Sequence, residues 1–332
     1  MKALVTGGTG FLGRRLAIRL RDAGWEVTAM ARRGDARQAL HARGIRFLQA
    51  DLRNKEAVLE ACAGQDAVFH CGALSSSWGA YQKFYDTNVT GTAHVIEGCI
   101  RHGAARMIHV STPSVCFGSG HRMNVRETDP LPARPASSYA ATKQLAEDAV
   151  NRAVAAGLPA IIIRPRAVIG PGDTSILPRL IAANAQRRLP MIDQGRALID
   201  LTYVDNVVDA MVLCQKAPAD RIGRTYHISN GEPLPFAEAA QRLFRKLGQP
   251  LHAKRLSFAA AYTAASLMEL TAALLPGSRE PMLTRAVAGM IGRSQTLDIG
   301  AARSELGYTP HISIDEGLDA FAAWWRECSH DA

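Results

Sequence analysis

Short apolar runs alternate with amphipathic stretches along the first half of the chain. Six runs have the length and the β-branched or aromatic content of buried strands. They cover residues 2–6, 25–30, 45–50, 66–70, 106–111 and 159–165. Between them, apolar residues recur with the period of a helix over 11–23, 54–63, 81–102 and 138–156. This alternation predicts an α/β fold with a doubly wound parallel sheet and a ligand crevice at the carboxyl ends of its strands.

The regular alternation ends near residue 170. Helix-like pieces are then mixed with short strands, over 177–188, 198–203, 205–216, 225–229, 235–247, 257–291 and 314–327. We therefore predict a Rossmann-type, nucleotide-binding domain over residues 1–168, to which segments within about 198–229 return. Residues 169–332 are predicted to form mainly a smaller C-terminal lobe that caps the crevice and binds substrate.

Composition narrows the class of partner. The chain has 332 residues, of which 47% are hydrophobic and 21% charged, as in ordinary globular proteins. The net charge of +9 comes from Lys and Arg spread along the whole chain, with no basic tail and no basic helix. We interpret this charge as favouring solubility and small anionic ligands, and we expect no nucleic-acid partner.

Cysteine spacing and the apolar segments bear on location. The six cysteines lie far apart without metal-ligand spacing, which predicts reduced thiols, no metal site and a cytoplasmic location. An apolar strand begins at residue 2, so we expect no signal peptide. The stretch Leu256–Ser278 carries only one charge, at Glu269. A buried or lid helix pair explains it better than a membrane span, with peripheral membrane contact as the alternative.

A glycine-rich turn follows the first strand and opens the first helix. Gly7, Gly10 and Gly13 stand where a dinucleotide site needs a tight turn, close approach of backbone amides to a pyrophosphate, and close helix–sheet packing. The start of the helix then faces the phosphates. We predict that the cofactor contacts of this turn are Gly7, Thr9, Gly10, Phe11, Leu12 and Gly13.

The end of the second strand indicates which dinucleotide binds. Sites for NAD usually place Asp or Glu there, whereas this chain has Arg32 and Arg33 after Ala31. Two guanidinium groups suit a 2′-phosphate, so NADP(H) is favoured over NAD(H). Asp35 lies close enough to keep NAD as the alternative. Asp51 and Leu52, at the end of the third strand, are predicted to flank the adenine, with an exposed strand-end Asp as the competing interpretation.

The stretch "SSYAATK" sets Tyr139 four residues before Lys143, which places both on one face of a predicted helix. Most pairs at this spacing are solvated surface residues, so the spacing alone is a weak signal. Its meaning depends on the motifs that accompany it, which are the glycine turn and the hydroxyl-rich strand end "VSTPSV".

This combination of motifs resembles the extended short-chain dehydrogenases/reductases, over essentially the whole chain. Within them, the sequence is similar to the 3β-hydroxysteroid dehydrogenase branch and, more narrowly, to 2-alkyl-3-oxoalkanoate reductases of bacterial olefin biosynthesis. The supporting stretches are "TNVTGT" (87–92), "RPRAVIGPGD" (164–173), "LTYVDNVVDA" (201–210), "ISNGEPLP" and "PHISIDEGL".

The resemblance implies the roles of the site residues. Tyr139 would protonate the ketone oxygen while hydride passes from the nicotinamide, and Lys143 would lower the tyrosine pKa and hold the ribose. A strand-end hydroxyl would stabilise the oxyanion, with Thr112 preferred and Ser114 one register shift away. The remaining matches are Asn88, in a structural or proton-relay role, and Pro165 and Val168, beside the nicotinamide carboxamide.

The substrate implied by the resemblance is a hydrophobic keto or hydroxy acid. The predicted activity is NADP(H)-dependent reduction of the 3-keto group of a long-chain 2-alkyl-3-oxoalkanoate. Alternatives are a sterol, a dihydroflavonol-type ketone or a nucleotide sugar, and a non-catalytic NADP-binding sensor. Three arginines could hold a substrate anion or form salt bridges, namely Arg164, Arg166 and Arg179. The family also implies a homodimer joined through helices 81–102 and 138–156.

Overall fold

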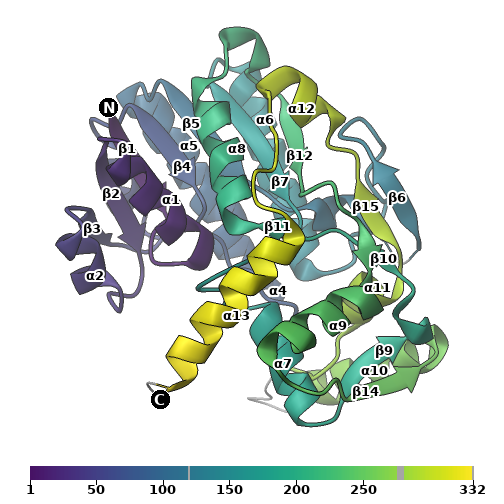
Figure 1. The fold of residues 1–332 in the computed structure, drawn as a ribbon. Coiled ribbons are helices and arrows are strands. Elements are labelled where there is room, and N and C mark those ends of the chain that lie inside the picture. Colours follow the sequence, from purple (N-terminus) through teal and green to yellow (C-terminus); the bar gives the residue numbers. More distant parts are fainter. Residues whose placement is uncertain (119, 275–279, 331–332) are drawn as a thin grey trace.

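The main sheet has seven parallel strands in the order β12-β7-β5-β4-β1-β2-β3. The computed structural model describes residues 1–118, 120–274 and 280–330 (Figure 1). The strands are β1 (Lys2–Thr6), β2 (Glu26–Ala31), β3 (Arg46–Gln49), β4 (Ala67–His70), β5 (Arg106–Val110), β7 (Ala160–Pro165) and β12 (Thr225–Ile228). The first six agree with the predicted strands to within one residue at each end, which confirms the doubly wound fold.

Helices cover both faces of this sheet. One face carries α1 (Phe11–Asp22), α8 (Val204–Lys216) and α12 (Gly300–Leu306), and Figure 1 shows α1 and α8 side by side across it. The other face carries α3 (Lys55–Cys62), α5 (Gly91–His102) and α6 (Ser138–Ala155), while α2 (Arg37–Ala42) packs beside β3. Side chains alternate along a strand, so Ile161 and Ile163 pack in the hydrophobic core on the α1 and α8 face of the sheet. Ile162 packs in the core on the opposite face, under α3, α5 and α6. The centre of β7 is therefore apolar at every position.

The predicted helix over 81–102 is interrupted by a π-helical turn. It consists of α4 (Tyr81–Phe84), a π turn over Tyr85–Thr90, and α5. A π turn inserts an extra residue and occurs mostly near functional sites. Here it carries Asn88, whose buried amide bonds groups outside the helix. Periodicity alone does not predict such an insertion, because the apolar face continues on both sides of it.

A second hydrophobic core lies outside the main sheet, in the lower part of Figure 1. It is built from α7 (Leu177–Ala185), β9 (Leu189–Ile192), α9 (Phe236–Leu247), β14 (Ala253–Leu256), α10 (Phe258–Leu274), α11 (Arg285–Gly292) and α13 (Ile314–His330). A four-stranded sheet contains β6 (Arg122–Val125), β10 (Leu198–Ile199), β13 (Leu234–Pro235) and β15 (Gln295–Leu297). The short strands β8 (Val168–Ile169) and β11 (Thr202–Tyr203) pair with each other. Chain segments thus cross between the sheets several times after residue 165.

A buried ion pair holds α6 against β7. Arg164 donates to both carboxylate oxygens of Glu147, at 2.9 and 2.6 Å, and both side chains are buried. The same guanidinium also reaches Nε2 of His227 on β12 at 3.2 Å. Removing one partner of such a pair leaves an uncompensated buried charge and typically costs about 3–5 kcal/mol. The pair therefore fixes the position of the helix that carries Tyr139 and Lys143.

The described ranges contain no helix with the length and apolar character that crossing a bilayer requires.

Candidate active site

The turn between β1 and α1 accepts only glycine at two positions. Gly7 has φ +67°, and a Cβ there would lie 2.9 Å from the backbone of Gly72. A Cβ on Gly13 would lie 2.3 Å from the carbonyl oxygen of Gly7. Since nonbonded carbon and oxygen atoms cannot approach this closely, larger residues would displace α1 from β1. The packing confirms that Gly7 is needed for a tight turn and Gly13 for close contact between α1 and β1.

The start of α1 presents backbone amides without a side-chain cap. Gly10 is the N-cap residue and supplies no side-chain acceptor, and the helix begins at Phe11. Thr9 and Phe11 are partly exposed, while Leu12 packs against the core of the sheet. Free amides at a helix start favour a bound phosphate. The residues present here therefore fit the pyrophosphate of a dinucleotide.

The carboxyl end of β2 carries two exposed guanidinium groups. Arg32 and Arg33 follow the last residue of the strand directly. Asp51, after β3, pairs with Arg53 at 2.8 Å, and this contact holds the pKa of Asp51 below its usual value, with a smaller contribution from Arg32. Leu52 is buried beneath the turn. Both arginines face solvent at the edge where a bound adenosine ribose would lie, as a 2′-phosphate site requires.

Tyr139 lies in the first turn of α6, near the hydroxyls of Ser75 and Thr112. Burial raises the pKa of Tyr139, and these two neighbouring hydroxyls offset the rise only in part. The phenol therefore keeps its proton at neutral pH, which is the form that can act as a general acid. Ser75, in the loop after β4, was not predicted as a site residue. Its position after a strand end was the only available signal.

Of the two candidate strand-end hydroxyls, Thr112 lies beside the phenol. It follows β5 and caps the short turn Pro113–Cys116, accepting a hydrogen bond from the Ser114 amide at 3.2 Å. The Thr112 hydroxyl donates to Ser114 Oγ at 3.1 Å. Ser114 thus holds the Thr112 side chain through two hydrogen bonds, and this arrangement favours Thr112 as the catalytic hydroxyl.

Lys143 is fully buried one turn after Tyr139. Its ammonium donates to the carbonyl oxygen of Val110 at 2.8 Å and lies 3.2 Å from Nε2 of His109. Burial lowers the pKa of Lys143 to about 8. The ammonium is not among the groups that shift the pKa of Tyr139, contrary to the expectation that it lowers this pKa. It is anchored instead at the end of β5.

Two buried histidines form the wall behind this ammonium. The ring of His70 bonds the hydroxyls of Thr6 and Thr92, at 2.8 and 3.0 Å, and lies 5.2 Å from the ring of His109. Burial and the Lys143 charge lower the pKa of His70 to about 3 and that of His109 well below its usual value. Both rings are therefore neutral at physiological pH and add no second positive charge.

Asn88 connects the loop after β4 with α6. Its amide accepts from the Leu74 amide at 2.7 Å and donates to the Leu74 carbonyl at 3.2 Å and to Thr142 Oγ1 at 3.1 Å. These bonds hold the residue preceding Ser75 against the helix that carries Tyr139. The structure thus favours the structural role over the proton-relay role.

The loop after β7 contains a strained residue between the two predicted nicotinamide contacts. Pro165 ends β7 and Val168 begins β8, while Ala167 between them has φ +39°. This left-handed conformation is unfavourable for any residue with a Cβ and clusters at functional sites. It turns the backbone of this loop back toward β11, where the Ala167 carbonyl accepts from the Thr202 amide at 3.1 Å.

The groups at the carboxyl edge of the sheet can perform hydride-transfer chemistry. A bound nicotinamide dinucleotide would supply or accept the hydride. Tyr139 holds the proton that moves to or from the substrate oxygen, and Ser75 and the Thr112–Ser114 pair place further hydroxyls near that phenol. A Rossmann-type sheet, a phosphate-binding turn and this Tyr–Lys–hydroxyl cluster together define a nicotinamide-dependent dehydrogenase or reductase.

Comparison with known proteins agrees with this class. The chain belongs to the NAD dependent epimerase/dehydratase family, whose model matches residues 3–229. It is therefore an NAD(P)-dependent oxidoreductase, and the predicted resemblance to extended short-chain dehydrogenases/reductases is confirmed.

Two relatives and one solved structure illustrate the range of the family. A 2-alkyl-3-oxoalkanoate reductase of Stenotrophomonas maltophilia (strain K279a) is 39% identical, over 96% of this chain and 97% of its own length. A 3beta-hydroxysteroid-dehydrogenase/decarboxylase of Arabidopsis thaliana is 33% identical, over 95% of this chain and 77% of its own length. UDP-glucuronic acid 4-epimerase from Bacillus cereus in complex with NAD shares the fold, with a TM-score of 0.78 and 22% identity over 98% and 97% of the two chains.

The buried Lys143 gives a prediction about stability. Its pKa of about 8 lies below the ordinary 10.5, so between these values the unfolded chain binds more protons than the folded chain. The cost of burying the ammonium is therefore fully present below pH 8 and disappears above pH 10.5. Relative to a Lys143→Met variant, the wild type should gain about 2–3 kcal/mol between pH 7 and pH 10.

Urea unfolding of both proteins at several pH values measures this difference. The exposed Lys254 provides the matched control, since a Lys254→Met variant should follow the wild type at every pH. A wild-type–Lys143→Met difference that does not change with pH would contradict the assignment of a neutralisable buried ammonium.

Proposed function

We propose that the protein is an NADP(H)-dependent ketoreductase that converts the 3-keto group of a long-chain 2-alkyl-3-oxoalkanoate to a hydroxyl. The observation that carries the proposal is the protonated phenol of Tyr139 one helical turn before the buried Lys143, whose ammonium binds the Val110 carbonyl at the end of β5. A phenol that keeps its proton suits ketone reduction, in which the acid donates that proton. The 39% identity to a reductase of this name supports the substrate class.

The surface of α10 supports a hydrophobic substrate. Leu267, Leu270 and Leu274 are 59, 57 and 72% exposed, and they lie on one side of the helix. Only Ala261 and Ala265 of this helix are buried. A helix that is apolar on all sides is normally buried, so an exposed one indicates contact with an apolar ligand or a lipid surface. The apolar sequence of this region also makes Leu275 a candidate for such a contact, but Leu275 lies outside the described residues.

The competing functions account for fewer of these features. A nucleotide-sugar epimerase needs cationic groups for a diphosphate, but Arg164 and Arg179 are paired with Glu147 and Glu280, which leaves only Arg166 of the three candidate arginines. A non-catalytic sensor has no need for Tyr139 and Lys143 at the end of β5. A sterol substrate remains compatible with the apolar α10 and with the 33% identity to the Arabidopsis dehydrogenase/decarboxylase.

The reaction can be tested in the oxidative direction, which starts from a stable hydroxy acid. Purified protein with NADP⁺ and a racemic 2-alkyl-3-hydroxyalkanoate should form reduced nicotinamide, followed by its absorbance. The rate should rise with alkyl chain length. Tyr139→Phe removes the proton-transferring hydroxyl and should lower kcat by about 10²–10⁴-fold. Turnover of a sterol in place of the hydroxy acid would refute the substrate assignment and retain the chemistry.

We propose NADP(H) as the preferred cofactor because Arg32 and Arg33 are exposed at the end of β2. Neither guanidinium forms an ion pair within the described residues, so both can meet a 2′-phosphate bidentately. NAD is the competing cofactor, since the solved epimerase contains it.

A binding measurement separates the two cofactors without a substrate. Replacing Arg32 and Arg33 with Ala should weaken NADP⁺ binding by about 10–100-fold, the value of one or two charged hydrogen bonds, and leave NAD⁺ binding within a factor of about three. Arg46→Ala, at the opposite end of β3, is the control. Tighter binding of NAD⁺ than NADP⁺ by the wild type would show that the preference is wrong.

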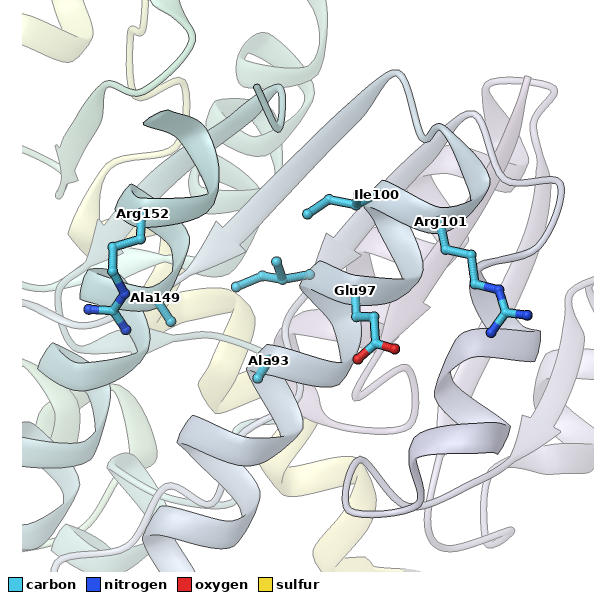
Figure 2. A pocket seen from close by; sticks show the side chains of 7 residues that line it. Ala93, Glu97, Ile100, Arg101, Ala149 and Arg152 are labelled. Atoms are coloured by element: carbon cyan, nitrogen blue, oxygen red, sulfur yellow. The ribbon is translucent and has the colours of Figure 1, made fainter. Parts of the chain in front are cut away.

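We propose that a second copy of the chain covers the outer face of α5 and α6. Figure 2 shows an open groove between these helices, with Ala93, Ile100 and Arg101 from α5 and Ala149 and Arg152 from α6. Ile100 is 56% exposed on this face. Two copies of the helix pair would bury this apolar surface against itself, as a two-fold symmetric interface requires.

Sedimentation velocity tests this interface. The wild type should sediment as a dimer and Ile100→Glu as a monomer, because the change would bury two carboxylates at a symmetric contact. Met123, equally exposed at 56% but on β6, is the matched control, and Met123→Glu should remain dimeric. A monomeric wild type would refute the interface. The cytoplasmic location and the two-domain division remain predictions.

A further inference from the structure

Arg166 is a buried cation with no carboxylate partner among the described residues. The side chain is 4% exposed, and its Nη2 donates to Oε1 of Gln295 at 3.0 Å. Its Nε is buried and has no acceptor. Burying a guanidinium without satisfying its donors is unfavourable, so such a group in a native fold requires an explanation.

The other two arginines that the sequence left open for a substrate anion are already paired. Arg164 binds Glu147 through two hydrogen bonds inside the protein. Arg179 binds Glu280 through two hydrogen bonds of 3.0 and 2.9 Å at the surface. Of the three, Arg166 alone has no carboxylate partner among the described residues, and its unsatisfied donor is buried.

Asp200 is the carboxylate that influences Arg166, but it does not satisfy the guanidinium. It accepts a hydrogen bond from the Leu297 amide at 2.7 Å and forms no ion pair with Arg166. Burial raises the pKa of Asp200 to about 6 and lowers that of Arg166 to about 10, although the two charges attract each other. Their attraction offsets only part of the cost of burial.

Strand register places Arg166 at the same edge of the sheet as Tyr139. Val110 of β5 is paired with Ile163 of β7, and Ser111 donates to the Ile163 carbonyl at 2.7 Å. Continuing this register brings Arg166 just past Thr112. Because side chains two residues apart share a face, Arg166 lies on the side of Arg164, which contacts α6.

The surroundings of Arg166 connect it with the catalytic turn. Its guanidinium carbon lies 4.8 Å from the ring centre of Phe117, which follows the turn that Thr112 caps. The next residue, Ala167, has the strained φ of +39°. Strain of this kind clusters at ligand-binding loops. Two independent observations, the unpartnered donor and the strained backbone, thus mark this loop.

We propose that Arg166 binds the carboxylate of the substrate, an assignment that rests on the reductase function proposed above. The planar fork of a guanidinium matches a carboxylate through two parallel hydrogen bonds. In a 3-oxo acid the ketone carbon lies two bonds from the carboxylate carbon. Anchoring the carboxylate at Arg166 therefore orients the ketone oxygen toward the hydroxyls of Tyr139 and Thr112.

The test compares an acid with its ester. Wild type and Arg166→Met are assayed with a 2-alkyl-3-hydroxyalkanoate, its methyl ester and NADP⁺. The variant should lose about 100-fold in kcat/KM for the acid and change less than about threefold for the ester, which cannot form the ion pair. Arg166→Lys should recover part of the loss, and Arg179→Met should leave the acid-to-ester ratio unchanged. Equal losses on acid and ester would overturn the proposal, since they indicate a structural role.

A wild type that turns over neither compound would refute the proposed function, and Arg166 is then judged by binding. Dodecanoate, with NADP⁺ present, should raise the Tm of the wild type and leave that of Arg166→Met unchanged. Equal shifts in both proteins would overturn the proposal. If uridine diphosphate raises the Tm only when Arg166 is present, and dodecanoate does not raise it, Arg166 binds a phosphate. That result would also overturn the proposal.

Discussion

The candidate site depends on the position of α6 relative to the carboxyl ends of β5 and β7. The buried Arg164–Glu147 pair fixes the middle of this helix to the sheet, and Asn88 ties its first turns to the loop after β4. Both contacts satisfy polar groups that would be costly to bury alone. Together with the bond from Lys143 to the Val110 carbonyl, these two contacts position Tyr139 and Lys143 at the end of β5.

Burial then determines the protonation state of the site. It raises the pKa of Tyr139, lowers that of Lys143 to about 8, and keeps His70 and His109 neutral. The site therefore combines a neutral acid with one destabilised cation and a polar, uncharged wall. The Lys143 ammonium lies beside the end of β5, close to Tyr139, and it forms no ion pair within the described residues. Burying the Lys143 ammonium lowers the free energy of unfolding, as is common for groups at functional sites.

Residues outside the main sheet add the features that bear on the proposed substrate. The apolar side of α10 faces solvent, and Arg166 keeps unused donors at the end of β7. One suits an alkyl chain and the other a carboxylate. These are the two chemical features of the proposed substrate.

Periodicity and glycine placement in the sequence were sufficient for all seven main strands, including β12 within the predicted strand 225–229, and for the phosphate-binding turn, because these are local properties of the chain. The spacing of Tyr139 and Lys143 likewise follows from one turn of helix. The π turn at Asn88, the position of Ser75 near Tyr139, and the hydrogen bond from Thr112 to Ser114 were decided by tertiary structure. So was the difference between the paired Arg164 and the unpaired Arg166, which stand two residues apart in one strand end. Each of these depends on which distant group lies opposite a side chain, and no local pattern contains that information.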